Sequence, residues 1–295
     1  IRDVERSRGL GDVYKRQSLL HWAEIVSDIT PPGVLNVITG YGTEAGEEIV
    51  KHPSIPIITF TGSVKTGKRI AMHAAENLKK ISLELGGKDP VIICDDADID
   101  VAAKGTSWGG FVNSGQVCTS IERVYVFSNV ADRFTESLVE ESKKVKLGDP
   151  MDKDTDIGPM ASKAQLKNTV KKVALAKEEG ARILTGGHRP KEFARGYFFS
   201  PTILDRVRPD MEIVTEESFS PVIPIQKVDS LDEAIKMSNA TKYGLGCTIF
   251  TRDIERAMNA ADKIKSGTVC INTVSYTHLR AHETSLHLVC RLLLE

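Results

Sequence analysis

Apolar residues near the start of the chain follow helical spacing and then give way to short runs rich in β-branched residues. From residue 18 to residue 29 they recur every three or four positions, and the prolines at 31 and 32 end that helix. Further along, the same pattern predicts a strand over 34–40, a helix over 43–52, a strand over 55–62, a helix over 65–78 and a strand over 80–85. Such alternation predicts a parallel sheet with crossover helices.

The alternation continues beyond residue 90, so the chain is expected to belong to the α/β class. The predicted elements are strands over 90–96 and 122–128, helices over 98–115, about 131–146 and about 161–179, and a further apolar run over 181–187. No Pro- or Ser-rich linker divides the chain. The double glycine at 86 and 87 is the best candidate for a hinge, which predicts two α/β units over residues 18–87 and 88–274.

The two ends of the chain do not fit this pattern. Residues 1–17 carry mixed charges without a period, and residues 275–295 contain three of the seven histidines. We therefore expect both ends to be foreign, adapter-like sequence, a leader and a tail around the native segment. A metal site at His278, His282 and His287 is the alternative. No carboxylate or cysteine ligands surround these histidines in the manner of a closed zinc site, so no metal is predicted.

Charge and composition narrow the classes of function. The chain has 39 Lys and Arg against 40 Asp and Glu, which gives no overall field for nucleic acid or for an anionic membrane surface. Its apolar runs meet charged residues well before the roughly 20 positions that a membrane-spanning helix needs. The five cysteines are odd in number and scattered, which favours a reducing cytoplasm over a secreted disulfide scaffold. Small molecules or further copies of the chain are the expected partners.

The stretch "FTGSVKTGKRI", residues 60–70, is the first candidate binding site. A predicted strand ends there, and Gly62, Ser63 and Gly67 lie between it and the body of the next helix. Free backbone N–H groups and the positive end of a helix dipole can bind an anion at such a turn, and a dinucleotide pyrophosphate is suitable. The motif is neither G-x-G-x-x-G nor a P-loop, so a plain helix cap by Ser63 is an equal alternative.

Two further residues carry candidate chemistry. Glu84 stands between leucines at the end of a predicted strand, where a buried carboxylate would suit a general base. Cys118 follows small and polar residues and precedes a strand, where its backbone N–H would supply half an oxyanion hole. Each has a plain structural alternative, an exposed strand edge for Glu84 and a packed thiol for Cys118. Together with a nucleotide-binding turn they favour covalent catalysis, in which hydride transfer generates a thioester that is then hydrolysed.

Four motifs occur in an order and at separations that resemble the NAD(P)-dependent aldehyde dehydrogenase superfamily. They are "FTGSVKTG" at 60–67, "LELGGKDP" at 83–90, "GQVC" at 115–118 and "EESFSPV" at 216–222. The resemblance covers essentially all of residues 18–274. It implies an aldehyde dehydrogenase-like α/β fold, with a partial Rossmann-type NAD(P)-binding domain over 18–87 and an α/β catalytic domain over 88–274 that is truncated at its C-terminal end.

The resemblance also implies roles for individual residues. Cys118 would attack the aldehyde carbonyl to form a thiohemiacetal, and Glu84 would activate the water that hydrolyses the thioester. By the same likeness, NAD or NADP would be bound by Gly46, Thr61, Gly62, Ser63, Gly67, Leu85, Gly86, Glu217 and Phe219. Among these, Glu217 would bond the nicotinamide ribose and Phe219 would press against the cofactor.

Parts of the family's pattern do not occur in the 295 residues. The family's upstream asparagine, whose amide completes the oxyanion hole, is missing, together with the first part of the nucleotide-binding sheet and the final oligomerisation strand. By the family resemblance, we expect the parent protein to be a cytoplasmic aldehyde dehydrogenase that forms a homodimer or homotetramer. The present chain is expected to be a nearly inactive fragment, since losing one oxyanion donor costs roughly 100-fold or more in turnover.

Two other functions stay open, a cysteine hydrolase and a non-catalytic protein that keeps the fold. A hydrolase needs an imidazole to activate its thiol, and no histidine has a matching sequence context. The substrate also stays open among small aliphatic aldehydes, semialdehydes, lactaldehyde and betaine aldehyde. Of the remaining thiols, Cys270 would shape the substrate pocket by the family likeness, whereas Cys94 and Cys247 are expected to be packed structural residues.

Overall fold

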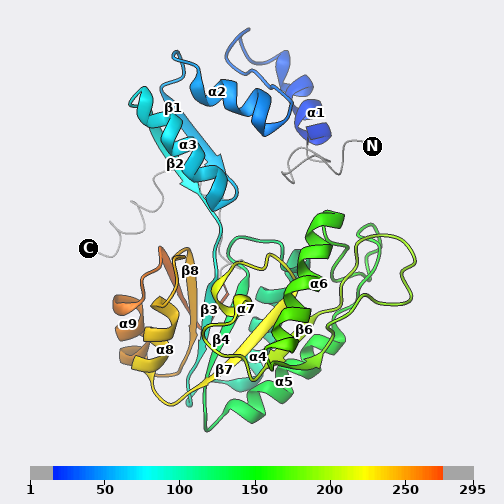
Figure 1. The fold of residues 1–295 in the computed structure, drawn as a ribbon, viewed down its shortest axis with the longest axis vertical. Helices are drawn as coiled ribbons and strands as arrows, with labels where there is room; N and C mark the ends of the chain where they lie inside the picture. The colour runs from blue at the N-terminus through cyan, green and yellow to red at the C-terminus, as the bar shows by residue number, and fades with distance from the viewer. Residues whose placement is uncertain (1–15, 275–295) are drawn as a thin grey trace.

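The computed structural model describes residues 16–274, which form a smaller and a larger lobe joined by a short connection after β2 (Figure 1). The smaller lobe contains α1 (Arg16–Ser27), a π-helical turn η2 (Gly42–Gly46), α2 (Glu47–Lys51), β1 (Ile57–Thr61), α3 (Val64–Glu76) and β2 (Lys80–Glu84). These bounds agree within two residues with the predicted elements, so the pattern of apolar positions identified these helices and strands correctly. The predicted leader and tail fall largely outside the described residues, although α1 begins at Arg16.

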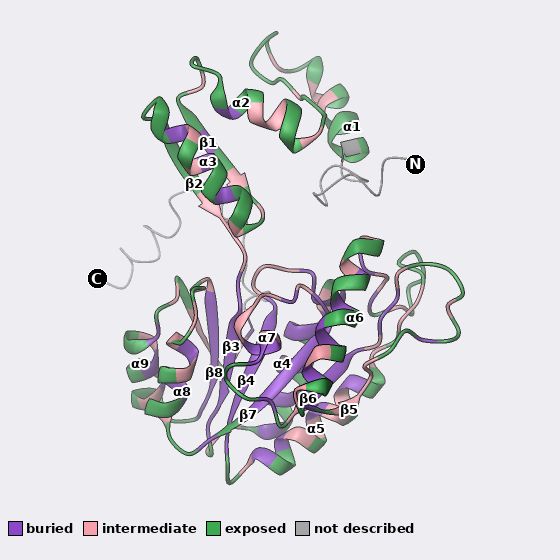
Figure 2. Cartoon of the chain, viewed as in Figure 1, coloured by how far each residue is buried: buried purple, intermediate pink, exposed green. Residues whose placement is uncertain are grey.

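The smaller lobe is built around two parallel strands. Strands β1 and β2 pair from Ile57 opposite Lys80 to Thr61 opposite Glu84, with α3 as their crossover. Its small core consists of Val50, Ile58, Ile70 and Ala74, with Ile55, Phe60 and Leu83 packed against it. Most of the other residues in this lobe are exposed, as Figure 2 shows, so little apolar surface is removed from water here.

The strand predicted over residues 34–40 does not form. This segment follows a turn and runs on as irregular chain up to η2, and Val34 and Ile38 are 70% and 64% exposed. A β-branched run becomes a strand only when a neighbouring strand accepts its backbone hydrogen bonds. Among the described residues the small sheet contains only β1 and β2, and neither pairs with this run.

The larger lobe contains a seven-stranded sheet in the order β5-β6-β7-β4-β3-β8-β9. Its strands are β3 (Asp89–Ile93), β4 (Ile121–Phe127), β5 (Arg182–Thr185), β6 (Thr202–Asp205), β7 (Val222–Val228), β8 (Gly246–Phe250) and β9 (Thr268–Ile271). Every neighbouring pair is parallel except β5 and β6. The predicted parallel α/β architecture is therefore confirmed, with one antiparallel strand at the edge of the sheet.

Helices cover both faces of this sheet. They are α4 (Ile99–Phe111), α5 (Ala131–Lys144), α6 (Lys163–Glu178), the short α7 (Glu212–Thr215), α8 (Leu231–Asn239) and α9 (Ile254–Lys263). The helix predicted over 98–115 ends early, at Phe111, and a 3₁₀ turn η3 (Val112–Gly115) follows it. Asn113 and Ser114 have positive φ angles of 52° and 58°, which an α-helix cannot accommodate.

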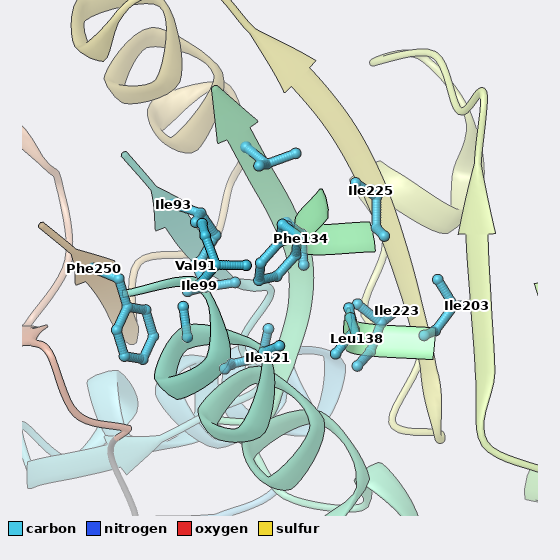
Figure 3. Close-up of a cluster of buried hydrophobic side chains, with 14 of the residues drawn as sticks. Val91, Ile93, Ile99, Ile121, Phe134, Leu138, Ile203, Ile223, Ile225 and Phe250 are labelled. Atoms are coloured by element: carbon cyan, nitrogen blue, oxygen red, sulfur yellow. The ribbon is translucent and has the colours of Figure 1, made fainter. Parts of the chain in front are cut away.

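Alternate residues of the central strands enter two different cores. Val91 and Ile93 of β3 belong to the cluster on the side of α4 and α5, in which Phe134 lies beside Val91 and Leu138 lies beside Ile223 (Figure 3). Ile92, between the first two, belongs to the opposite cluster with residues of α8 and α9. Because both faces are covered, the strand reads as a continuous apolar run rather than as an alternating one. This core holds the ends of the central strands in fixed positions.

The parallel arrangement brings the segments that precede the central strands to one edge of the large sheet. Residues 85–88 lead into β3, residues 116–120 into β4, residues 216–221 into β7 and residues 243–245 into β8. Glu84 and Thr61, by contrast, end the two strands of the small sheet. The carboxyl ends of the small sheet and the amino ends of the large one therefore meet at the connection between the lobes, which is where most of the predicted site residues lie.

Candidate active site

The turn between β1 and α3 has the geometry that the sequence predicted. Thr61 ends β1, and the backbone N–H of Gly62 donates to the carbonyl of Glu84 at 3.0 Å, which ties the turn to the end of β2. Ser63 is the N-cap of α3, and its hydroxyl accepts from the backbone N–H of Thr66 at 3.2 Å. The plain helix cap is thus realised, and it leaves the exposed N-terminus of a 13-residue helix at the end of the sheet.

Glycine permits close packing at two of the predicted positions. A Cβ at Gly67 in α3 would lie 2.5 Å from a methyl group of Leu85. A Cβ at Gly86 would lie 2.2 Å from Oε2 of Glu217, so residue 217 reaches across to the connection between the lobes. Leu85, Gly86, Gly67 and Glu217 are therefore neighbours at the connection between the lobes.

Gly46 is placed differently. It ends η2 and precedes α2, and a Cβ there would meet no atom within 4 Å. Neither packing nor backbone conformation requires a glycine at this position, because its φ angle is an ordinary −63°. The described contacts do not join Gly46 to the turn at residues 61–63, so its predicted role as a cofactor residue stays a prediction.

A strained loop carries the candidate nucleophile. Asn113, Ser114 and Gly115 all have positive φ angles, and a Cβ at Gly115 would lie 2.2 Å from the carbonyl oxygen of Ser220. The Ser114 hydroxyl donates to the carbonyl of Gly158 at 2.6 Å. Nearby, Oε1 of Gln116 accepts from the backbone N–H of Ala161 at 2.7 Å. These contacts fix the chain immediately before Cys118, and they explain the small and polar residues of this stretch.

Cys118 is partly buried and lies against the double glycine. A Cβ at Gly87 would come within 2.2 Å of the Cys118 carbonyl oxygen, so the second glycine permits the two segments to touch. Burial raises the pKa of the Cys118 thiol, and the carboxylates of Asp89 and Glu84 raise it further. Glu84 is itself partly buried. Its charge acts on the thiol, so folding brings these two candidate catalytic residues into one electrostatic environment.

The other described thiols lie in different surroundings. Cys94 and Cys247 are 0% and 2% exposed within the core, which confirms that they are packed. Burial raises the pKa of Cys94 to about 11 and that of Cys247 further still. Cys270 is partly buried on β9. Cys118 combines partial burial with the charge of a carboxylate from another segment.

Glu217 and Phe219 lie in the segment before β7. A carboxylate oxygen of Glu217 accepts from the backbone N–H of Gly87 at 3.2 Å, and its backbone carbonyl accepts from Nζ of Lys172 at 3.0 Å. Burial, together with the nearby negative charge of Glu122, raises the Glu217 pKa to about 7. Phe219 has a positive φ of 50°, an uncommon conformation for an aromatic residue.

The sequence reasoning missed a buried ion pair beneath this segment. Lys88 and Glu122 are 1% and 2% exposed, and Nζ of Lys88 lies 2.6 Å from Oε2 of Glu122. Burial lowers the Lys88 pKa, whereas the charge of Glu122 opposes that shift. The sequence did carry a signal for this pair, because Lys88 and Glu122 are charged residues at the starts of two apolar strands whose two faces are both covered. A charge in such a place requires a partner.

No cluster of three or more His, Cys, Asp or Glu residues that could hold a metal occurs within residues 16–274. The histidines at 278, 282 and 287 lie outside the described residues. Over the same range, no helix has the length and apolar character to cross a membrane. The arrangement of a thiol, a neighbouring carboxylate and a tightly packed glycine pair suits nucleophilic attack followed by hydrolysis.

Comparison with known proteins identifies the family. Residues 16–283 match the model of the aldehyde dehydrogenase family, a range that crosses both predicted boundaries of the native segment. The peroxisomal aminoaldehyde dehydrogenase 2 of Malus domestica is 41% identical over 254 residues, which are 86% of this chain and 50% of that protein. The chain belongs to the aldehyde dehydrogenase family. It spans about half the length of the curated relatives it matches.

Solved structures show the same likeness. Lactaldehyde dehydrogenase from Escherichia coli superposes with a TM-score of 0.85 at 40% identity, and the match covers 90% of this chain and 55% of that one. Betaine aldehyde dehydrogenase from Staphylococcus aureus, solved in complex with NAD+, gives a TM-score of 0.86 at 37% identity and covers 90% of this chain and 53% of its own. The aldehyde dehydrogenase-like α/β fold is therefore established over the described part of the chain.

Alkylation of Cys118 provides a test of its surroundings. Because burial and two carboxylates raise the thiol pKa above the ordinary 9.0, the rate of modification by iodoacetamide should keep rising at pH values above 9. Peptide-resolved mass spectrometry would measure this rate, with glutathione as the unburied control. A Cys118 profile that levels off at or below the glutathione profile would contradict the described environment.

A second test concerns Glu217 and stability. Its raised pKa of about 7, against an ordinary 4.5, means that the folded chain binds a proton here more tightly than the unfolded chain does. The group's favourable contribution is therefore complete below about pH 4.5 and is lost as the pH rises through 7. Relative to wild type, Glu217→Gln should gain about 1–3 kcal/mol in unfolding free energy between pH 5 and pH 8.

Urea unfolding at both pH values measures this difference. Glu136→Gln, at an exposed position on α5, is the matched control and should show no comparable pH-dependent gain. Equal changes in the two variants would mean that Glu217 is not buried against a like charge in the folded chain.

Proposed function

We propose that the protein oxidises an aldehyde to a carboxylic acid with NAD+ or NADP+, through a covalent adduct on Cys118. The observation that carries this proposal is the meeting of three segments at the connection between the lobes. Gly87 packs on the Cys118 carbonyl, Gly86 packs on the Glu217 carboxylate, and the charge of Glu84 acts on the thiol. Family membership supports the same chemistry. Activity of the whole protein is part of the proposal, because the chain covers about half of its relatives.

The residues present fit a dinucleotide cofactor. Thr61, Gly62 and Ser63 form an exposed turn at the N-terminus of α3, which suits the pyrophosphate, with Gly67 in the helix behind them. Glu217 lies directly over Gly86, where the absence of a side chain leaves backbone available beside a carboxylate that accepts hydrogen bonds. We assign Leu85, Gly86, Glu217 and Phe219 to the nicotinamide half and Gly46 to the adenosine half. The chemistry that NAD(P)+ supplies when bound is acceptance of a hydride from the Cys118 adduct.

Cys118 and Glu84 divide the remaining chemistry. The Cys118 sulfur attacks the carbonyl carbon of the aldehyde, and its thiol proton leaves to solvent or a base. After hydride loss the acyl group is held as a thioester on the same sulfur. Glu84 accepts a proton from the water that attacks the thioester carbon, which releases the acid and restores the thiol. The backbone N–H of Cys118 contributes to stabilising the oxyanion.

The raised thiol pKa has a functional reading within this proposal. A thiol whose pKa is raised by burial and by the charges of Asp89 and Glu84 stays protonated more readily in the absence of cofactor, which limits side reactions of the sulfur. The positively charged nicotinamide ring of NAD(P)+, when bound beside Cys118, would oppose the effect of those carboxylates. Binding of the cofactor would therefore favour the reactive thiolate at the point where it is needed.

We also propose a substrate class, an assembly and a compartment for the protein. The similar proteins are named for aminoaldehydes, betaine aldehyde and lactaldehyde, so we propose a small aldehyde as substrate. We propose the NAD(P)-binding domain over residues 18–87 and the catalytic domain over 88–274, with a homodimer or homotetramer for the whole protein. A reducing compartment such as the cytoplasm fits the free thiols at four described cysteines, although the apple relative is named peroxisomal.

A cysteine hydrolase finds less support. Each of the four histidines within residues 16–274 has its contacts elsewhere, two of them with glutamates of the smaller lobe. An imidazole beside the Cys118 sulfur is the feature that this alternative needs. In the mechanism proposed here Glu84 acts on the hydrolytic water and does not replace that imidazole.

Substitution of the two proposed catalytic residues should produce different defects. Cys118→Ser should lower aldehyde-dependent NAD(P)H formation by at least roughly 1,000-fold, since the covalent route is lost. Glu84→Gln should still give a single burst of NAD(P)H but slow steady turnover by about 100-fold or more, because hydrolysis loses its base. Stopped-flow absorbance with a panel of small aldehydes measures both phases.

The measurement applies to this chain and to the same chain extended to the length of its relatives. Cys94→Ala, which removes a buried thiol far from the site, is the matched control and should keep its activity. If the extended protein is folded but reduces neither NAD+ nor NADP+ with any aldehyde, the proposal is wrong.

A further inference from the structure

We propose that Glu122 is a positioning residue that holds the segment Glu217–Phe219 in place for the cofactor, with Lys88 as its counter-charge. The inference rests on the function proposed above and adds to it a residue outside the family motifs quoted in the sequence. Glu122 lies at the start of β4 and contacts neither the thiol nor the exposed turn at α3 in the described contacts. It holds the other segment through hydrogen bonds to that segment's backbone.

The geometry of the carboxylate is specific. Oε2 of Glu122 accepts from the backbone N–H of Ser218 at 2.6 Å, and Oε1 accepts from the backbone N–H of Phe219 at 2.7 Å. Two successive amides of one segment are thus bound by the two oxygens of one buried carboxylate. Hydrogen bonds between amides and an ionised carboxylate are short and strong, particularly where water is excluded.

Lys88 extends the same contact to the connection between the lobes. Its Nζ donates to Oε2 of Glu122 at 2.6 Å and to the Ser218 hydroxyl at 3.1 Å. Lys88 directly follows the double glycine, and its backbone carbonyl accepts from Nε of Arg123 at 2.7 Å. One buried ion pair therefore ties together the starts of β3 and β4 and the segment before β7. Those are the segments that place Gly86 against the Glu217 carboxylate.

The bound segment has a conformation that needs such support. Phe219 has a φ of 50°, in the left-handed region that residues with a side chain avoid. The carbonyls of Ser218 and Phe219 are held by Nε2 of Gln165 at 2.9 and 2.7 Å. Those contacts restrain one side of the backbone, whereas the amide side is held by Glu122. Removing the carboxylate would leave the buried N–H of Ser218 and the partly buried N–H of Phe219 without their acceptor, so the segment would shift and carry Glu217 with it.

The chemistry requires a carboxylate rather than an amide at position 122. A glutamine has the same shape but offers one oxygen, so it can accept from only one of the two amides. Its NH₂ group would face either a backbone N–H or the ammonium of Lys88, which are all donors. Glu122→Gln is therefore a nearly isosteric change that breaks the proposed function of the side chain and leaves its volume intact.

The chain offers a matched control at the opposite edge of the sheet. Oδ2 of Asp96 accepts from the backbone N–H groups of Arg252 and Asp253 at 2.8 and 3.0 Å, just after the carboxyl end of β3. Asp96→Asn thus removes a carboxylate that also binds two successive amides but lies away from the proposed cofactor segment. Comparing the two variants separates loss of position from general loss of stability.

The experiment has two readouts on the full 295-residue chain. Hydrogen exchange with mass spectrometry follows the amides of residues 212–221, and titration calorimetry follows binding of NAD+ and NADP+. Glu122→Gln should accelerate exchange in that peptide by at least tenfold and weaken cofactor binding by about tenfold. Asp96→Asn should change neither by more than about twofold. If Glu122→Gln does not fold, Lys88→Met/Glu122→Gln, which removes both buried charges, replaces it and should show the same two changes.

The outcomes distinguish this inference from the function on which it rests. Unchanged exchange in residues 212–221 would show that Glu122 does not hold the segment, and the inference would be overturned. Faster exchange with unchanged cofactor affinity would overturn it as well, since the position of the segment would then not serve the cofactor. Failure of the wild-type chain and of its extended form to bind either cofactor would contradict the proposed function, while the exchange readout would still decide whether Glu122 restrains the segment.

Discussion

A charge removed from water must be paired, and the buried pair of Lys88 and Glu122 satisfies this requirement where three strands of the large sheet begin. Its hydrogen bonds fix the backbone of residues 218 and 219, and Lys88 directly follows the connection between the lobes. The apolar cores on both faces of the sheet hold the strands themselves. The apolar cores thus hold the strands, and the buried ion pair holds the segment that carries Glu217 and Phe219.

The two lobes contribute to the site in different ways. The small sheet offers the carboxyl ends of β1 and β2, the usual location for a ligand in an open α/β sheet. The large sheet offers the amino ends of its central strands, where Cys118 precedes β4. Glycines at 86 and 87 allow these edges to approach closely, since a Cβ would lie 2.2 Å from Oε2 of Glu217 at position 86 and 2.2 Å from the Cys118 carbonyl oxygen at position 87. Aldehyde dehydrogenase chemistry places a nucleophile, a base and a dinucleotide together, and this geometry suits that need.

Periodicity in the sequence was sufficient to predict most helices and strands, because amphipathic and apolar runs report directly on burial. It failed at residues 34–40, where a β-branched run has no neighbouring strand among the described residues. The order of the four motifs indicated the family, whereas the catalytic pairing of Cys118 with Glu84 that the resemblance implies stays a prediction. The contact of Glu122 with the amides at 218 and 219 could not be predicted, because it joins residues almost a hundred positions apart and depends on the register of β4 beside β7. The double glycine lies in the connection between the lobes and packs closely there, and its interpretation as a hinge stays a prediction.

Direct detection of an acyl group on Cys118 tests the central claim most directly. The chain extended to the length of its relatives would be mixed with an aldehyde and NAD+, quenched in acid within one turnover, digested and analysed by mass spectrometry. An acyl group in place of the thiol hydrogen, found on the peptide containing Cys118 and formed only when NAD+ is present, is the predicted result. A folded protein that oxidises the aldehyde while its acyl group appears on another residue, or on none, would contradict it.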